Sequence, residues 1–156
     1  MLEGLDKMEI ERKFLVNKPK WELVNKPTPK RIVQAYLVRT PEKTIRVRVK
    51  GEKGFLTIKG PTVGISRSEF EYEIPLNEAN ELIEQFADKI IEKHRFEISI
   101  GNHLWEVDEF HGKLEGLMIA EIELTSEDET FEKPDWVTED VSLDQQYFNS
   151  NLVERC

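Results

Sequence analysis

Charged side chains occupy every second position in the segment MEIERKFLV, which begins at Met8. Glu9, Glu11 and Lys13 are each separated by one residue, so in a β-strand they would share one face. Carboxylate oxygens are hard ligands suited to Mg²⁺ or Mn²⁺, and an ammonium group suits phosphate. The segment is therefore either the solvated outer face of a strand or the charged lining of a site.

The same alternation recurs further along the chain. Cations dominate 44–60 and 90–95, whereas carboxylates dominate 105–124. A solubilising surface usually mixes the two signs, so this sorting favours a lining over an outer face. The alternating residues are Arg46, Arg48, Lys50, Lys59, Arg67, Glu69, Glu71, Glu73, Lys93, Arg95, Glu97, Glu106, Asp108, Glu121 and Glu123.

Eight segments have the period-2 pattern and the residue types of β-strands. Short turn-like links between most neighbours predict antiparallel hairpins. Eight strands can close into a barrel that holds a small ligand. We therefore predict an α+β protein built on an eight-stranded antiparallel closed β-barrel, a tunnel with a charged lumen and a few covering helices. The predicted strands are 9–16, 33–39, 44–50, 55–60, 67–74, 90–99, 103–110 and 117–124.

The apolar faces of such strands would point outward and need covering. Helices are predicted to do this, and a second subunit could add to them, which makes a homodimer one expected assembly. Asn77 is the expected N-cap of one helix, and SEDE has the form of a capping box that opens another before Pro134. The three tryptophans are expected to be covering or core residues. The predicted helices are 19–25, 78–89, a short one from 126–129, and 142–153.

The bulk composition sets limits on function. The 156 residues suit one domain, 1–156, in which 1–7, before Met8, are expected to be either an upstream start or a disordered arm. A net charge of −9 argues against a general nucleic-acid binder. Cys156 is the single cysteine, so no intrachain disulfide can form. The sequence contains no apolar run long enough to predict a membrane span, and a cytoplasmic protein is the default expectation.

The lining residues match the chemistry of a phosphate chain bound with metal. Six cations exceed what one phosphate needs: Lys13, Arg46, Arg48, Lys59, Lys93 and Arg95. Two Glu-x-Glu pairs, Glu9 with Glu11 and Glu121 with Glu123, could share one or two Mg²⁺ or Mn²⁺ ions with phosphate oxygens.

Taken in order, these motifs resemble the CYTH superfamily, the triphosphate tunnel metalloenzymes. The resemblance runs from Glu9 to about Leu152. The matching segments are EIERKFLV, QAYL, IRVRVK, TIKG, SRSEFEYEI, EKHRF, WEVDEF, AEIEL and the tail VSLDQQYFN. The resemblance implies an eight-stranded tunnel in which a metal-dependent attack on a triphosphate occurs.

The resemblance also implies roles for residues. The implied metal ligands are Glu9, Glu11, Glu121 and Glu123, with Asp108 as a further candidate. The implied phosphate-binding residues are Lys13, Arg46, Arg48, Lys59, Lys93 and Arg95.

Some single residues carry weaker expectations. Tyr36 is expected on a strand next to that of Lys13, where the ammonium would lower the pKa of the phenol and help to activate water. This gives the catalytic set Glu9, Glu11, Lys13 and Tyr36. Glu71 and Arg67 are expected to orient the cations. The three histidines have no metal-ligand spacing and receive no role.

The predicted function is metal-dependent hydrolysis of inorganic tripolyphosphate, a small-molecule triphosphate. The short chain leaves little room for a pocket that would bind a nucleobase or a thiamine group. Three alternatives stay open: a class IV-type adenylyl cyclase acting on ATP, a thiamine or nucleoside triphosphatase, and a polyphosphate-binding module without turnover.

Overall fold

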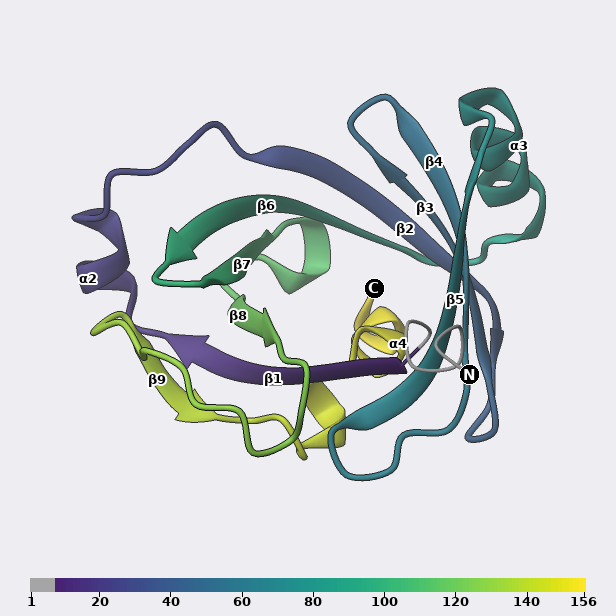
Figure 1. The fold of residues 1–156 in the computed structure, drawn as a ribbon. Coiled ribbons are helices and arrows are strands. Elements are labelled where there is room, and N and C mark those ends of the chain that lie inside the picture. The colour runs from purple at the N-terminus through teal and green to yellow at the C-terminus, as the bar shows by residue number, and fades with distance from the viewer. Residues whose placement is uncertain (1–7) are drawn as a thin grey trace.

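Eight antiparallel strands form a closed ring in the computed structural model, which describes residues 8–156 (Figure 1). The order around the ring is β5-β4-β3-β2-β6-β7-β8-β1, and β1 pairs again with β5. The predicted barrel is therefore confirmed, whereas the predicted arm, 1–7, lies outside the described residues. The strands are β1 (Met8–Val16), β2 (Lys30–Arg39), β3 (Thr44–Lys50), β4 (Lys53–Lys59), β5 (Ser66–Ile74), β6 (Ile90–Ile100), β7 (His103–Phe110) and β8 (Met118–Glu123).

Glycines make two of the tight hairpins. Gly51 links β3 to β4 with φ +61°, and Gly101 links β6 to β7 with φ +59°. These left-handed conformations are ones that glycine adopts without steric cost. The short links hold each pair of strands in a register that keeps their alternating charged residues on the same face of the sheet.

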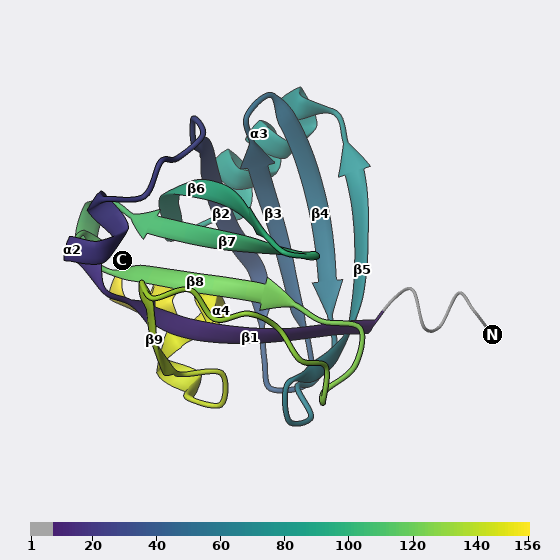
Figure 2. The ribbon, with the colours of Figure 1, turned by 60° about the vertical axis from the view of Figure 1, so that its left-hand side comes forward.

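β1 closes the barrel by pairing with β5, but only over its first three residues. Met8 to Ile10 pair with β5, while Glu11 to Leu15 pair with β8 on the other edge. Beyond the contact with β5, a ninth strand, β9 (Val137–Asp140), pairs with Phe14 and Val16 (Figure 2). β9 was not predicted, because VTED has little apolar content. It forms where β1 offers an edge that β5 no longer covers.

Aromatic residues cover the outer face of β1, β7 and β8. Trp21 lies on α2 (Lys18–Glu22), a helix capped by the Asn17 side chain, and its ring is 4.9 Å from that of Trp136. Phe14 on β1 packs against Trp105 at 5.6 Å. All three tryptophans are buried, so their prediction as covering or core residues is confirmed.

The segment that starts with SEDE is not helical, so that prediction is wrong. Thr125 donates to the Glu129 carboxylate from both its backbone N and its Oγ1, at 2.6 Å each. These bonds stabilise a turn in place of a helix. The chain then continues so that the Phe131 ring lies 6.1 Å from Phe14, which ties the segment to the aromatic layer before β9.

The helix α3 (Leu76–Phe86) covers β3 and β4. Gly54 permits this contact, because a Cβ at that position would lie 2.5 Å from the Ala79 Cβ. Pro75 occupies the N-cap and no side chain caps the helix, so the prediction of Asn77 as the cap is wrong. No helix in the described residues is long and apolar enough to span a membrane.

The C-terminal segment closes on one end of the barrel. The predicted helix at 142–153 is three short helical turns, which pack Leu152 and Val153 against Ile91, Phe110 and Ile119. Those three strand residues alternate with outward-facing ones and so face the lumen. The segment therefore contacts the inside of the tunnel rather than covering its outer face. The turns are η2 (Gln145–Tyr147), α4 (Asn149–Leu152) and η3 (Val153–Arg155), and η1 (Gly112–Leu114) precedes β8.

Candidate active site

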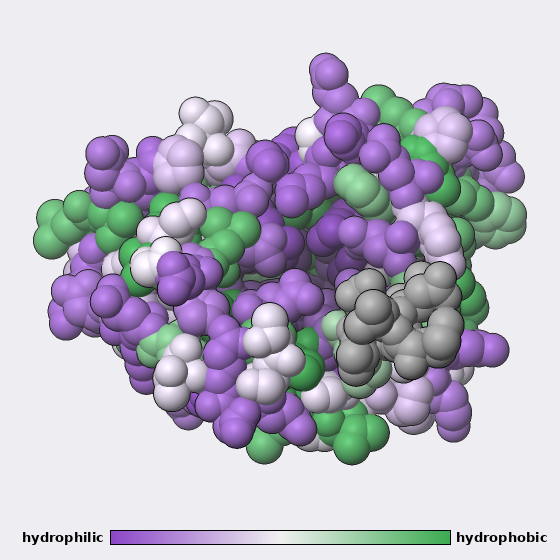
Figure 3. All heavy atoms as spheres, viewed as in Figure 1, coloured by the Kyte–Doolittle hydropathy of each residue, from purple (hydrophilic) through white to green (hydrophobic). Residues whose placement is uncertain are grey.

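A charged cavity of about 260 Å³ occupies the interior of the ring. Figure 3 shows hydrophilic residues around its opening. The alternating charges therefore line a lumen, as the sequence indicated. The lining residues on β1 to β5 are Glu9, Glu11, Lys13, Tyr36, Thr44, Arg46, Arg48, Lys50, Thr57, Lys59, Arg67, Glu69 and Glu71. Those on β6 to β8 are Arg95, Glu106, Glu121 and Glu123.

The strand order separates most of the lining into two walls of opposite charge. Apart from Lys13 on β1 and Arg67 on β5, the lining cations lie on β4, β3 and β6, within the arc β4-β3-β2-β6, whereas the carboxylates outside β5 lie on the arc β7-β8-β1. β5 joins the two arcs and carries both signs, with Arg67 next to Glu69 and Glu71 on the lumen face. Charges that are distant in sequence thereby face each other across one cavity.

Arg46 and Arg48 form the centre of the cationic wall, and both are buried. One carboxylate, Glu71, lies 3.7 Å from Arg46 and 3.3 Å from Arg48 and also accepts from Thr57 Oγ1 at 2.9 Å. The Nε of each arginine is buried without a hydrogen-bond acceptor among the described protein groups. Burial and the neighbouring cations Arg46 and Arg95 lower the pKa of Arg48 to about 10. This wall therefore has more positive charge and more donors than its protein partners neutralise, as an anion site requires.

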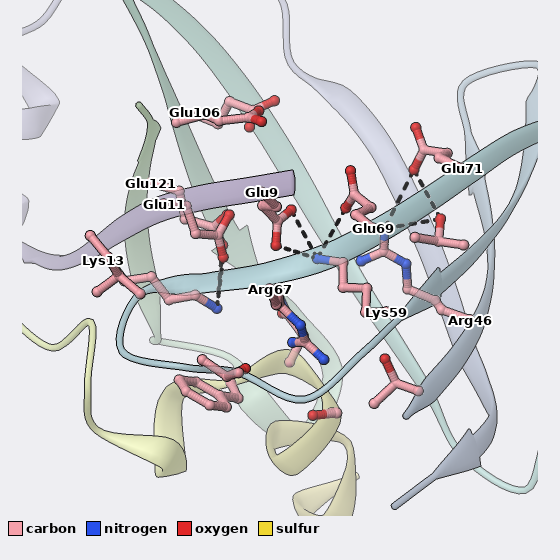
Figure 4. Close-up of a pocket in the computed structure, with 18 of the residues that line it drawn as sticks. Glu9, Glu11, Lys13, Arg46, Lys59, Arg67, Glu69, Glu71, Glu106 and Glu121 are labelled. Atoms are coloured by element: carbon pink, nitrogen blue, oxygen red, sulfur yellow. Dashed lines mark hydrogen bonds and ion pairs between the residues drawn. The ribbon is translucent and has the colours of Figure 1, made fainter. Parts of the chain in front are cut away.

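Lys59 reaches from the cationic arc to the carboxylates (Figure 4). Its Nζ lies 2.8 and 3.0 Å from the two oxygens of Glu9 and 3.3 Å from Glu69. Burial works to lower the pKa of Lys59, but Glu9 and its neighbouring carboxylates outweigh burial and raise it. Lys59 is therefore a charged partner of Glu9.

Lys13 lies among the carboxylates of β1 and β8. Its Nζ is 3.7 Å from Glu11 and 3.8 Å from Glu121, its directly opposed residue in the β1–β8 register (Figure 4). Burial works to lower the pKa of Lys13, but the carboxylates of Glu121 and Glu11 raise it overall. The ammonium is thus held in its charged form at the carboxylate wall.

The two Glu-x-Glu pairs are brought together as predicted, since Glu11 is directly opposite Glu123. Partial burial and the carboxylates of Glu9 and Glu69 raise the pKa of Glu123 to about 7. Burial and Glu11 likewise raise the pKa of Glu121. A divalent cation would relieve this repulsion, and an all-carboxylate donor set suits Mg²⁺ or Mn²⁺. Within residues 8–156 no three ligand-type side chains already stand in metal-binding geometry. Lys13 and Lys59 are instead the ion-pair partners of Glu11, Glu121 and Glu9.

Asp108 is fully buried between two cations. It accepts from Arg95 at 2.7 and 2.9 Å and lies 2.7 Å from Lys93. Although burial alone would raise the pKa of Asp108, Arg95 and Lys93 hold it well below its usual range. Burial, with Arg95 nearby, lowers the pKa of Lys93 to about 8 despite the Asp108 partner. Among the described residues, Lys93 and Asp108 lie behind the cavity surface, whereas Arg95 reaches it.

Tyr36 lines the cavity, but the predicted neighbourhood of its strand is wrong. β2 pairs with β3 and β6, whereas β1 pairs with β8, β5 and β9. The two strands lie across the barrel from each other in the ring order. Tyr36 and Lys13 therefore contribute to one cavity from facing strands.

The C-terminal segment adds lining residues for which no role was predicted. Ser142 accepts from the Lys13 backbone N at 2.8 Å, and the Phe148 ring centre lies 5.6 Å from the Lys13 Nζ. Asn149 accepts from Lys93 at 3.4 Å. The motif in VSLDQQYFN was the available signal, since it ends on Asn149.

The fold and the site are those of one class of protein, a closed antiparallel barrel with a charged tunnel. In this tunnel a wall of incompletely neutralised cations faces a wall of closely spaced carboxylates. The family model described as the CYTH domain matches residues 7–155. The chain therefore belongs to the CYTH domain family.

Two relatives match over nearly their whole lengths. A protein of Acetivibrio thermocellus named inorganic triphosphatase is 48% identical over 147 residues, which cover 94% of this chain and 93% of the relative. A protein of Nitrosomonas europaea with the same name is 37% identical, covering 93% and 96%.

Solved structures agree with the fold. The crystal structure of an inorganic triphosphatase matches with a TM-score of 0.65 and 31% identity, covering 93% of each chain. A putative adenylate cyclase from Bacillus halodurans matches with a TM-score of 0.62 and 20% identity, covering 78% of this chain and 83% of that one. At that identity the second match supports the fold alone.

Proposed function

We propose that this protein is a metal-dependent hydrolase of inorganic tripolyphosphate. The observation that carries the proposal is that Arg46 and Arg48, whose buried Nε donors have no protein acceptor within the described residues, line the same cavity as both Glu-x-Glu pairs. The names of the two curated relatives support the same activity. A substrate that needs both walls must carry several phosphate groups and bind with a cation.

In this proposal the cationic wall holds the phosphate chain. Arg46 and Arg48 donate paired N–H groups to phosphate oxygens, and Lys59 adds a point charge. Arg95 also reaches the cavity, oriented by its two bonds to Asp108. We assign Lys93 and Asp108 to positioning Arg95, because both are buried behind the cavity surface. Asp108 is thereby left out of the proposed metal ligands.

Glu9, Glu11, Glu121 and Glu123 are the proposed ligands of one or two Mg²⁺ or Mn²⁺ ions. When bound, such an ion neutralises phosphate charge and polarises the bond that is cleaved. Lys13 fixes the two carboxylates on either side of it, Glu11 and Glu121. Tyr36 lines the cavity from β2, and we propose that its Oη, as a phenolate stabilised by the Lys13 charge, accepts the proton of the attacking water and becomes the neutral phenol.

The size of the cavity supports a small inorganic substrate. About 260 Å³ lies below the usual range for sites that bind drug-sized ligands, which is about 300–1,000 Å³. A phosphate-release assay with tripolyphosphate, ATP, GTP and thiamine triphosphate, each with Mg²⁺ and Mn²⁺, tests this choice. Tripolyphosphate should give the highest kcat/KM. Cyclic AMP from ATP would instead identify a cyclase, and tight binding without phosphate release would identify a binding module.

The expected homodimer also stays a proposal. Ile58 and Tyr72 are exposed on the outer faces of β4 and β5. Light scattering after size-exclusion chromatography distinguishes a dimer from a monomer of 18.3 kDa.

A further inference from the structure

Two histidines meet on the outer face of the barrel, outside the tunnel. His94 on β6 is directly opposite Glu109 on β7, and His111 follows two residues after Glu109. His94 alternates with Lys93 and Arg95, so its side chain lies on the face opposite the lumen. The His94 Nδ1 lies 2.5 Å from the His111 Nε2, with the two rings at 80°. Two imidazole nitrogens therefore point at one position between adjacent strands.

The surroundings hold this pair in place. His111 continues the extended path of β7, and its backbone N donates to the Glu92 carbonyl at 3.0 Å. The Glu92 carboxylate is bound by Arg31 at 2.8 Å. Glu109 is the remaining carboxylate at the pair, with its Oε1 3.7 Å from the His111 Nε2. Two nitrogens and one nearby oxygen are thus supplied by β6 and by β7 with the residue that follows it.

We propose that His94 and His111 form a surface binding site for a divalent ion of late first-row type, Ni²⁺, Cu²⁺ or Zn²⁺. Two nitrogens as close as 2.5 Å can share one proton, and an ion that prefers imidazole can replace that proton after a small rotation of the rings. Within residues 8–156 no three ligand-type groups are preassembled, so water or a reoriented Glu109 completes the coordination. The sequence spacing did not reveal the site, because its ligands come from two strands.

This site is separable from the tunnel in both position and chemistry. The tunnel offers oxygen ligands, whereas the outer pair offers nitrogen. The full-length protein is therefore titrated with Cu²⁺ alone and followed by electron paramagnetic resonance, which reports nitrogen coupling. The variants are His94→Gln and His111→Gln. His103→Gln is the matched control, because His103 pairs with Glu129 away from this site.

The wild type and His103→Gln should show coupling to two nitrogens. Each of the other variants should lose one nitrogen and bind Zn²⁺ at least about tenfold more weakly in competition with a chromophoric chelator. Tripolyphosphate turnover with Mg²⁺ should not change in either variant. Nitrogen coupling and Zn²⁺ affinity that are unchanged in both variants, or lost in only one of them, would overturn the two-histidine site.

Discussion

The Lys59 ammonium group lies 2.8 and 3.0 Å from the two carboxylate oxygens of Glu9. A cation of β4 is therefore paired with a carboxylate proposed to bind metal. A divalent ion must compete with Lys59 for Glu9, and its binding would release the ammonium for phosphate. In the proposed function, metal and phosphate binding would thereby be coupled through one ion pair.

Replacing Lys59 with Met should separate its competition with metal for Glu9 from its contribution to phosphate binding. Without the competing ammonium, the apparent dissociation constant for Mn²⁺ in the absence of substrate should fall about tenfold, since a charged hydrogen bond contributes about 1.5 kcal/mol. The KM for tripolyphosphate should rise. Titration calorimetry and steady-state kinetics measure the two quantities. Lys53→Met, at an exposed lysine on the same strand, is the control, and weaker Mn²⁺ binding in Lys59→Met would refute the competition.

Replacing Arg48 with Ala should act mainly on substrate binding. The variant loses N–H donors that Glu71 only partly satisfies. We expect the KM for tripolyphosphate to rise about tenfold or more, with a smaller change in kcat. Arg31→Ala is the control, because Arg31 lies on the outer face and binds Glu92. Equal, negligible changes in both variants would argue that Arg48 does not touch the substrate.

Replacing Tyr36 with Phe tests the proposed proton acceptor. The variant keeps the ring and removes the Oη, so kcat should fall about a hundredfold where the wild type is most active. The difference should be greatest at alkaline pH, because the proposed role needs a deprotonated Oη. Tyr72→Phe, at an exposed tyrosine on β5, is the control. Full activity of Tyr36→Phe across alkaline pH would exclude this role.

Replacing Asp108 with Asn should destabilise the protein in a pH-dependent way. Lys93 and Arg95 hold the folded-state pKa of Asp108 below its unfolded value of about 3.9. The carboxylate therefore contributes stability above that pH, and the contribution is lost as pH falls. We expect the variant to be less stable by about 3 kcal/mol at pH 7. Urea denaturation measures the free energy of unfolding of both proteins at pH 7 and near pH 3. The difference between the wild type and the variant should be smaller near pH 3, and an equal difference at both pH values would contradict the ionic explanation.

The alternation in MEIERKFLV and its counterparts was enough to predict the charged lumen, because side-chain direction in a strand is a local property. The strands that pair in hairpins could also be predicted, because short links between neighbouring strands are likewise a local property of the sequence. The position of β2 relative to β1 could not, because it depends on strand pairings between distant segments, and the expected neighbourhood of Tyr36 and Lys13 was accordingly wrong.

Other features depend on contacts that no local pattern records. β9 forms because β1 leaves β5 beyond Ile10, and the segment at 126–129 bends to bring Phe131 onto the aromatic layer. Asp108 has the same spacing pattern as the lumen glutamates, yet Lys93 and Arg95 occupy both its oxygens. Distinguishing such a buried partner from a metal ligand requires knowing which cations lie beside it.

The role of the glutamates in metal-dependent hydrolysis is tested by phosphate release from tripolyphosphate. Release is measured for the wild type and Glu11→Gln, with and without Mn²⁺ or Mg²⁺. The wild type should require the metal, and Glu11→Gln should lose at least about a hundredfold in kcat while still binding tripolyphosphate. Glu73→Gln, at an exposed glutamate of β5, should match the wild type. Metal-independent release by the wild type, or full activity of Glu11→Gln, would contradict a metal-dependent triphosphatase centred on these glutamates.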